Sequence, residues 1–454
     1  MLRAFGAERA PGPAELDAPL PSALPSQIEA TLAAEVDPDQ AALFARRFRS
    51  VAALLAGMSQ PEARLLEVAL YRRGAQILAE PAPHALRIRA LVDYVWSQAA
   101  VVQHRRPEAP TLEALAERLA AREVAPGLHH GTIEGISREG PVHLNVLRAR
   151  APRLRCLDAR GPESLLELAR AHGALAAISG GFFLYSEPDI EPPSRRTDPV
   201  GALVSEGQVL GPPVFARATL CQRRDGSLAI EQRGMAGVEL SFSGGRRVVV
   251  GQDAQLVNRA QARVAQGQGP ALAVVGSRVS ARGEGALPVP LAGFVLRLRA
   301  GPLPAVGEEV RYRLPDEPAQ AMAGGPFLLG EGALDLEREE FAGSAPPLTF
   351  SQDETFDRNL LPRMAVGLRA DGELIALAVD GRNAERAPGL TLRGTARVLR
   401  ALGCVSAMNL DGGSSKRMLV AGRVVDLPST EVLSGAAGAA RVRPVHSAIL
   451  FLRR

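Results

Sequence analysis

Lysine is almost absent from this sequence: Lys416 is the only one, so arginine supplies the rest of the 53 Lys and Arg residues. The formal net charge is only +4, and the arginines are interspersed with acidic residues. This pattern argues against a basic stripe for nucleic acid, and no nucleic-acid partner is expected. Aromatic residues make up 4% of the chain, so we expect a core built mainly of Ala, Leu and Val.

Cysteine and long apolar runs are also scarce. Cys156, Cys221 and Cys404 are far apart and include no CxxC pair, so no complete disulfide framework is expected and we interpret them as buried small hydrophobes. No run approaches the roughly 20 apolar residues of a membrane span. The first residues contain no apolar segment typical of a secretory signal. The sequence therefore predicts a cytoplasmic protein without a membrane span.

The length of 454 residues predicts more than one domain. Residues 1–26 are rich in Pro and Ala and predict a disordered leader, whereas 27–125 have helical periodicity and predict a small all-α module. Within that module, Ser59 to Glu62 predict a capping box and Thr111 a helix cap. Residues 126–454 predict an α+β domain with a mixed sheet, in which 212–320 form a β-rich elaboration.

A strand, helix and strand follow one another near the C-terminus. Residues 373–382 have the pattern of a buried strand that ends at Asp380, 391–402 predict a helix, and 405–411 predict a strand that ends at Asp411. The spacing predicts a βαβ unit with neighbouring parallel strands. Both aspartates would then lie at the carboxyl edge of the sheet, where open α/β sheets bind their ligands.

A hairpin around Asp371-Gly372 precedes this unit. If its turn has two residues, Arg363 lies opposite Asp380, and we expect Arg363, Arg382, Asp380 and Asp411 to converge on one crevice. The alternative is that each Asp-Gly is only a turn. Downstream of Asp411, the segment that could bind an anion consists of Gly412, Gly413, Ser414, Ser415 and Lys416. Lys416 is either a point charge for that anion or present by chance.

At these residues the sequence resembles the phosphodiester glycosidase family. The matching segments are ISGGFF (178–183), GGPFLLGEG (324–332), PRMAVG (362–367), VDGR (379–382), NLDGGSS (409–415) and RPVHSAIL (443–450). Their order and spacing cover about 126–450. The resemblance implies hydrolysis of a sugar-1-phosphodiester at its glycosidic bond. No cofactor is expected, and Asp380 and Asp411 alone offer no full oxygen cage for a divalent ion.

That reaction needs cations for the leaving phosphate and a carboxylate for the developing oxocarbenium ion. Arg363, Arg382 and Lys416 suit the first role. Asp411 is the first candidate for the second role and Asp380 the next, although Asp380 could instead orient an arginine in a structural ion pair. For the sugar, the resemblance implies that Asn409 and Ser179 bind hydroxyl groups and that Gly180 and Gly181 allow close approach.

Several positions depart from the family pattern. Ser179 stands where the family has asparagine, Met364 replaces threonine, Ser414 replaces a third glycine, and Lys416-Arg417 replace small hydroxyl residues. These departures leave two alternatives open. The first is a hydrolase that acts on another phosphodiester, such as a nucleotide-linked or lipid-linked sugar. The second is a binding or scaffold protein whose helical module contacts a protein partner.

Overall fold

A computed structural model describes residues 23–35, 38–81, 84–159, 164–183, 199–291, 293–339, 359–383, 386–428 and 444–453. The predicted leader falls outside these ranges as far as residue 22. Among the described helices, none is long and apolar enough to cross a bilayer. All three cysteines are buried, as expected, and burial raises the pKa of Cys221 and Cys404 to about 12.

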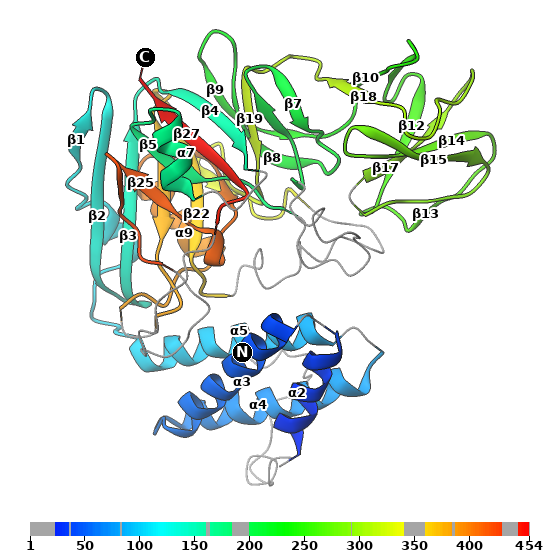
Figure 1. Ribbon diagram of the computed structural model, residues 1–454. Helices are drawn as coiled ribbons and strands as arrows, with labels where there is room; N and C mark the ends of the chain where they lie inside the picture. The colour runs from blue at the N-terminus through cyan, green and yellow to red at the C-terminus, as the bar shows by residue number, and fades with distance from the viewer. Residues whose placement is uncertain are drawn as a thin grey trace.

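Four helices form a bundle that packs against one end of the β-rich part of the chain (Figure 1). They are α2 (Leu24–Glu35), α3 (Pro38–Ala56), α4 (Pro61–Ala79) and α5 (Ala85–His104). Their apolar faces enclose one core that includes Phe48, Leu66 and Trp96. The Ser59 capping box is wrong, because Gln60 occupies the N-cap of α4 and makes no side-chain cap bond. The cap at Thr111 is confirmed, since its hydroxyl accepts the Ala114 N–H at 3.2 Å.

The remaining chain is built around a sandwich of two antiparallel sheets. The larger sheet runs in the order β1 (Arg122–Ala125), β2 (Leu128–Ser137), β3 (Gly140–Ala149), β23 (Leu374–Val379), β22 (Arg363–Arg369), β24 (Cys404–Leu410), β20 (Phe327–Gly330) and β21 (Ala333–Leu334). The smaller sheet runs in the order β26 (Arg423–Val424), β25 (Met418–Val420), β5 (Ala176–Ser179), β27 (Ser447–Leu452) and β4 (Arg153–Asp158).

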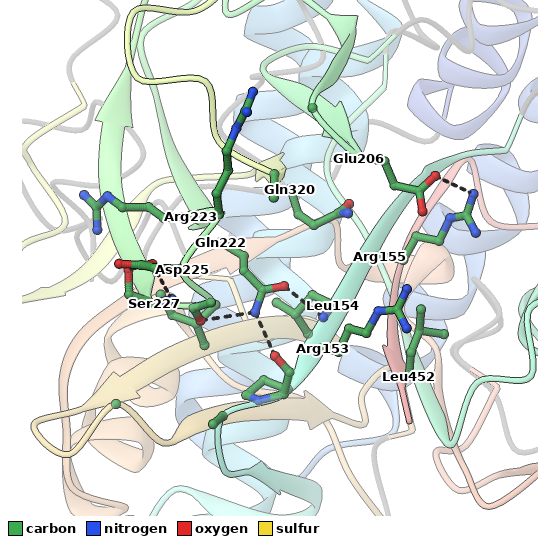
Figure 2. Close-up of a pocket in the computed structure, with 18 of the residues that line it drawn as sticks. Arg153, Leu154, Arg155, Glu206, Gln222, Arg223, Asp225, Ser227, Gln320 and Leu452 are labelled. Atoms are coloured by element: carbon green, nitrogen blue, oxygen red, sulfur yellow. Dashed lines mark hydrogen bonds and ion pairs between the residues drawn. The ribbon is translucent and has the colours of Figure 1, made fainter. Parts of the chain in front are cut away.

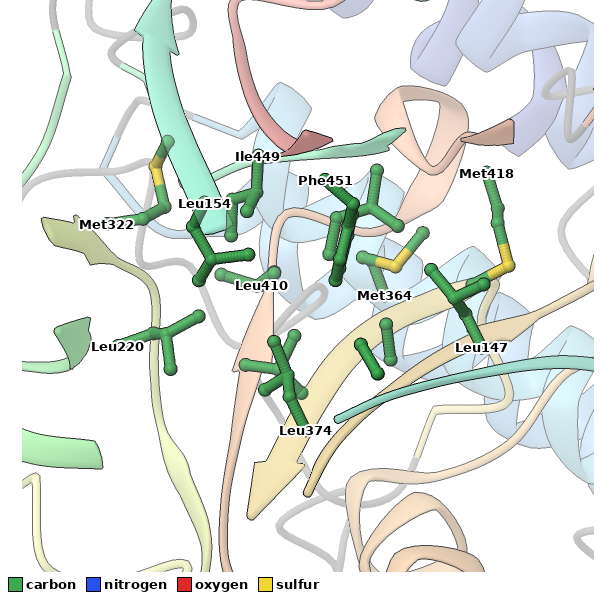
Figure 3. Close-up of a cluster of buried hydrophobic side chains, with 14 of the residues drawn as sticks. Leu147, Leu154, Leu220, Met322, Met364, Leu374, Leu410, Met418, Ile449 and Phe451 are labelled. Atoms are coloured by element: carbon green, nitrogen blue, oxygen red, sulfur yellow. The ribbon is translucent and has the colours of Figure 1, made fainter. Parts of the chain in front are cut away.

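Apolar side chains of both sheets meet between them (Figure 3). Met364, Leu410, Ile449 and Phe451 belong to this inter-sheet core. The outer face of the larger sheet is covered by α6 (Leu112–Ala116) and α9 (Leu392–Ala401), and that of the smaller sheet by α7 (Leu165–Ala171). Helices on both outer faces and apolar side chains between the sheets give the predicted α+β fold, but both sheets are antiparallel where the sequence predicts a mixed sheet.

The predicted βαβ unit is not confirmed as a pair of neighbouring strands. The strands β23 and β24 run in the same direction and α9 connects them, but β22 lies between them and pairs antiparallel with both. The hairpin β22–β23 places β22 beside β23, and its free edge then accepts β24. Because both outer strands keep one direction, Asp380 and Asp411 still follow strand ends at the same edge.

The register of that hairpin differs by one residue from the expectation. Arg363 pairs with Val379, so Asp380 lies one position beyond it. The loop holds three residues instead of two, because the Arg369 N–H bonds to the Glu373 carbonyl at 3.0 Å and the Gly372 N–H to the Arg369 carbonyl at 3.0 Å. Gly372 has φ +79°, the left-handed conformation that closes a three-residue hairpin.

Most of the segment 199–323 forms further small sheets beside the sandwich (Figure 1). They contain β6 (Leu203–Ser205), β7 (Gln208–Gly211), β8 (Arg217–Gln222), β9 (Leu228–Arg233), β10 (Glu239–Phe242), β11 (Arg247–Val249), β12 (Ala254–Asn258), β13 (Val264–Ala265), β14 (Pro270–Val275), β15 (Arg278–Glu284), β16 (Leu287–Pro288), β17 (Gly293–Leu298), β18 (Val310–Arg313) and β19 (Gln320–Ala323). Phe215, Phe242 and Phe294 anchor their shared core.

We predict that Phe451→Ala lowers the free energy of unfolding of the sandwich by about 3–5 kcal/mol, because it leaves a cavity between the sheets. Val424→Ala, at an exposed strand position of the same sheet, is the control and should cost less than about 1 kcal/mol. Urea unfolding followed by far-ultraviolet circular dichroism measures both. The fluorescence of Trp96, the single tryptophan, reports on the helical bundle separately. Equal losses in the two variants would contradict the assigned core.

Candidate functional site

Three chain segments meet at Pro362, directly before β22. A Cβ atom on Gly381 would lie 2.5 Å from the Pro362 nitrogen, and one on Gly412 would lie 2.5 Å from its carbonyl oxygen. The Gly413 N–H also donates to that carbonyl at 2.9 Å. Glycine is therefore required at 381 and 412 by close backbone packing, and the segments that follow Asp380 and Asp411 are held side by side.

Strand alternation separates the predicted residues into two sets. Met364 and Leu410 face the inter-sheet core, so their neighbours Arg363 and Asn409 face the side covered by α9. The Arg363 Nε donates to the Leu390 carbonyl at 3.2 Å, directly before that helix. Asp380 instead shares the inter-sheet face with Ala378. Arg363 and Asp380 therefore leave the sheet on opposite faces.

Asn409 and Asp411 are both buried at the end of β24. The Asn409 Nδ2 donates to the Gly325 carbonyl at 3.1 Å, while its Oδ1 accepts no hydrogen bond from the described residues. The Asp411 N–H donates to the Gly180 carbonyl at 3.1 Å, which joins the end of β24 to the end of β5. A buried acceptor without a donor is costly, so the Asn409 Oδ1 is suited to a hydroxyl group from outside the chain.

Arg382 extends from the end of β23 toward the turn after β24. Its backbone has φ +61°, a left-handed conformation that costs a residue with a side chain about 1–3 kcal/mol. The Arg382 N–H donates to the Pro388 carbonyl at 3.1 Å and holds this conformation. A Cβ atom on Gly413 would lie 3.4 Å from the Arg382 Nη2, so the guanidinium lies directly against the glycine turn that follows Asp411.

The turn itself uses part of its donors internally. Residues 413–415 form one turn of 3₁₀ helix, in which the amides of Ser415 and Lys416 both donate to the Gly412 carbonyl, at 3.0 and 3.2 Å. The Ser415 side chain is buried and Ser414 is partly exposed. The amides of Ser415 and Lys416 are therefore engaged within the turn, and anion binding by this segment stays a prediction.

The segment at 179–181 is closely packed. The Ser179 hydroxyl accepts the Arg417 N–H at 3.1 Å. A Cβ atom on Gly180 would lie 2.4 Å from the Ser447 hydroxyl oxygen, and one on Gly181 would lie 2.0 Å from the Ala323 carbonyl oxygen. Glycine is thus demanded here by neighbouring protein atoms, and sugar binding by these three residues is an untested prediction.

Lys416 is fully buried among acidic groups. Its ammonium group pairs with Asp380 Oδ1, with Asp426 Oδ2 at 2.8 Å, and with the Leu427 carbonyl at 3.0 Å. These three partners match its three N–H donors. Asp426 also accepts the Met418 N–H at 2.6 Å and contacts Arg417 at 3.2 Å. Both Lys416 and Arg417, which depart from the family pattern, therefore belong to one buried ion network.

Sequence reasoning missed His143, on β3. Its Nδ1 lies 2.5 Å from Asp380 Oδ2, and its carbonyl accepts the Asp380 N–H at 3.0 Å. The partners of Asp380 are therefore a histidine and the lysine, not an arginine. A histidine that alternates onto the same face as Asn145 in a buried strand was the only available signal, and it does not identify a partner more than 200 residues away.

Burial alone would raise the pKa of Asp380, but the hydrogen bond with His143 and the charge of Lys416 outweigh it, so this pKa lies below its usual value. A carboxylate with a lowered folded pKa stabilises the fold above its unfolded pKa, about 3.9, and loses that effect as the pH falls through the folded value. We therefore expect the contribution to be complete at neutral pH and to disappear only below about pH 4.

Comparisons with known proteins identify the C-terminal part of the chain. Residues 292–452 match the phosphodiester glycosidase family. This confirms the resemblance for the segments GGPFLLGEG, PRMAVG, VDGR and NLDGGSS, which lie within the match. The family assignment supports a glycosidase-type function.

Individual relatives of this phosphodiester glycosidase domain are distant. The SPbeta prophage-derived protein YomE of Bacillus subtilis is 38% identical over 65 residues, which are 14% of this chain and 10% of that protein. A hypothetical protein from Synechocystis has 21% identity and a TM-score of 0.47, with 74% of this chain and 64% of that chain covered. The catalytic domain of zebrafish N-acetylglucosamine-1-phosphodiester alpha-N-acetylglucosaminidase has 14% identity and a TM-score of 0.44, with 77% and 89% covered.

A cavity of about 1080 Å³ lies at the end of β22 and β23 that is opposite Asp380 (Figure 2). Arg153 and Arg155 on β4 and the turn Asp371-Gly372 contribute to its wall. That turn joins β22 to β23 at the end opposite Asp380, so this cavity is separate from the predicted phosphodiester glycosidase site. In the described ranges, no group of three or more His, Cys, Asp or Glu side chains is placed to hold a metal ion.

We predict that Lys416→Met destabilises the phosphodiester glycosidase domain by about 3–5 kcal/mol, because Asp380 loses its buried ammonium partner and Asp426 keeps only Arg417. Arg423→Met, which removes an exposed cation from β26, should change the free energy of unfolding by less than about 0.5 kcal/mol. Urea denaturation at pH 7 gives both values. A loss below 1 kcal/mol for Lys416→Met would contradict the structural importance of the buried pairs.

Proposed function

We propose that this protein hydrolyses the glycosidic bond of a sugar-1-phosphodiester. The observation that carries the proposal is the position of Arg382, whose guanidinium is held by an unfavourable backbone conformation against the turn that follows Asp411. A cation and a carboxylate at one sheet edge match the two charges of the reaction, namely the departing phosphate and the oxocarbenium-like sugar. The family match over 292–452 supports the same reaction class.

Asp411 is the carboxylate proposed to act at the anomeric carbon. Both oxygens of Asp380 are already engaged, Oδ1 by Lys416 and the Leu427 N–H, and Oδ2 by His143. A carboxylate with all these partners at 1% exposure is poorly placed to attack a sugar. Asp411 lies two strands away from Asp380, roughly 10 Å along the sheet, so the two carboxylates are assigned different roles.

The phosphate is assigned to Arg382, and a sugar hydroxyl to the Asn409 Oδ1. Arg382 offers a planar guanidinium at the turn, which suits a phosphate oxygen pair. Arg363 donates to the carbonyls of Leu390 and Asn359, so we assign it to holding these segments as well as to substrate binding.

A second candidate function is a phosphoglycan-binding or scaffold protein that no longer turns over its ligand. The supporting observation is that the Ser179 hydroxyl, at the family's asparagine position, is used by the Arg417 N–H. The helical bundle would then contact a protein partner. This candidate predicts binding of a phosphodiester glycan without release of sugar.

We predict that the wild type releases free sugar from at least one of UDP-N-acetylglucosamine, an aryl-phosphodiester analogue and other sugar-1-phosphodiesters. Asp411→Asn should lower kcat at least about 10²-fold, because the charge that stabilises the transition state is removed. Arg423→Met is the control and should keep wild-type kcat. Absence of turnover by folded wild type on the whole panel would overturn the glycosidase proposal in favour of the binding protein.

A further inference from the structure

His143 and Asp380 are joined through both backbone and side chains. In the antiparallel pairing of β3 with β23, Leu144 lies opposite Val379. His143 directly precedes Leu144 and Asp380 directly follows Val379, so these two residues come together at the strand ends. The backbone bond of 3.0 Å fixes their separation, and the 2.5 Å contact from Nδ1 to Oδ2 fixes the ring. The backbone bond therefore sets the spacing of the two residues, and the side-chain contact orients the imidazole.

The partners of Asp380 determine which ring nitrogen carries the proton. Oδ1 accepts from the Lys416 ammonium group and from the Leu427 N–H at 3.1 Å, so the carboxylate is charged and acts as an acceptor. An acceptor at Oδ2 requires a donor at Nδ1. The neutral imidazole then carries its proton on Nδ1 and leaves a basic lone pair on Nε2.

That second nitrogen is available for chemistry. Nε2 of His143 makes no hydrogen bond with any other residue in the described part of the chain, and the side chain keeps 9% of its surface exposed. Across β2, Glu134 lies opposite His143, but its side chain is 62% exposed and extends toward Arg386 at 3.8 Å. The charged groups that face the ring are therefore Asp380 from β23, with Lys416 behind it, and Glu134 from β2.

The ion network behind the ring is electrically balanced. Asp380 and Asp426 contribute two negative charges, and Lys416 and Arg417 contribute two positive charges. Without the lysine, the network would carry one net negative charge. Lys416 thus balances the charge of Asp380, whose Oδ2 contacts Nδ1 of the ring.

We propose that His143 is the general base of the hydrolysis and that Asp380 and Lys416 are its positioning residues. This inference rests on the proposed function.

In the hydrolytic step, the water oxygen forms a bond to the anomeric carbon and the Nε2 lone pair takes one water proton. The bond that the anomeric carbon then loses is to the phosphate oxygen or, if Asp411 has attacked first, to the Asp411 carboxylate, and the electron pair stays on that oxygen. The proton passes from Nε2 to solvent, which restores the neutral ring.

The first test needs no activity. Nitrogen-15 labelled histidine reports the tautomer of each ring, and the signal of His143 is assigned among the seven histidines by its loss in His143→Gln. In the neutral ring of the wild type, Nδ1 is expected to be protonated and Nε2 unprotonated. In Asp380→Asn the proton should move to Nε2, because an amide can donate to Nδ1. Protonation of Nε2 in the neutral wild-type ring would overturn the proposal.

The second test separates proton transfer from binding. On a substrate that the wild type turns over, His143→Gln and Asp380→Asn are each expected to lower kcat by about 10²–10⁴-fold with less than about threefold change in KM. His129→Gln, which changes another histidine on β2, is the matched control, and circular dichroism confirms folding of each variant.

The outcomes distinguish the two proposals. Unchanged kcat in folded His143→Gln, together with a loss in Asp411→Asn, would overturn the role of His143 and leave the glycosidase intact. Absence of turnover by the wild type would overturn the proposed function and, with it, the role of His143 as a base. Loss of kcat in both His143→Gln and Asp380→Asn, with the expected tautomer in the wild type, would support the proposal.

Discussion

One buried ammonium group ties the two sheets together at the end where the candidate site lies. Lys416 pairs with Asp380 after β23 of the larger sheet and with Asp426, which accepts the first amide of β25 in the smaller sheet. Removing one partner of such a buried set leaves an uncompensated charge, which costs far more than any single contact contributes. Asp380, which contacts His143, and Asp426, which accepts the first amide of β25, are both paired with this cation.

The architecture explains why the chemistry gathers at this edge. Two strands of one direction end at Asp380 and Asp411, and the antiparallel strand between them begins at Arg363. Glycines 381 and 412 let the outgoing segments pack on Pro362, so that Arg382 can lie against Gly413. The proposed roles of these residues follow the two faces of the larger sheet. The ion network and His143 lie on the inter-sheet face, and Arg363 and Asn409 lie on the face covered by α9.

Local patterns in the sequence predicted part of this arrangement. The apolar runs that end in Asp-Gly correctly predicted both strand ends, because such a pattern depends only on the local sequence. The hairpin register was wrong by one residue, because the third loop residue depends on the left-handed Gly372. The position of β22 between β23 and β24 and the contact from His143 to Asp380 could not be predicted from local patterns, because both depend on how distant segments pair. A lone lysine indicated importance without indicating that two of its three partners are buried carboxylates.

Selective nitrogen-15 labelling of lysine gives a single signal, that of Lys416, and tests whether this side chain is buried in ion pairs or lies at the surface. If Lys416 pairs with Asp380 and Asp426, its ammonium protons should exchange slowly with solvent at neutral pH and show proximity to the His143 ring. A rapidly exchanging ammonium group, modified by an amine reagent in the folded protein, would contradict the account.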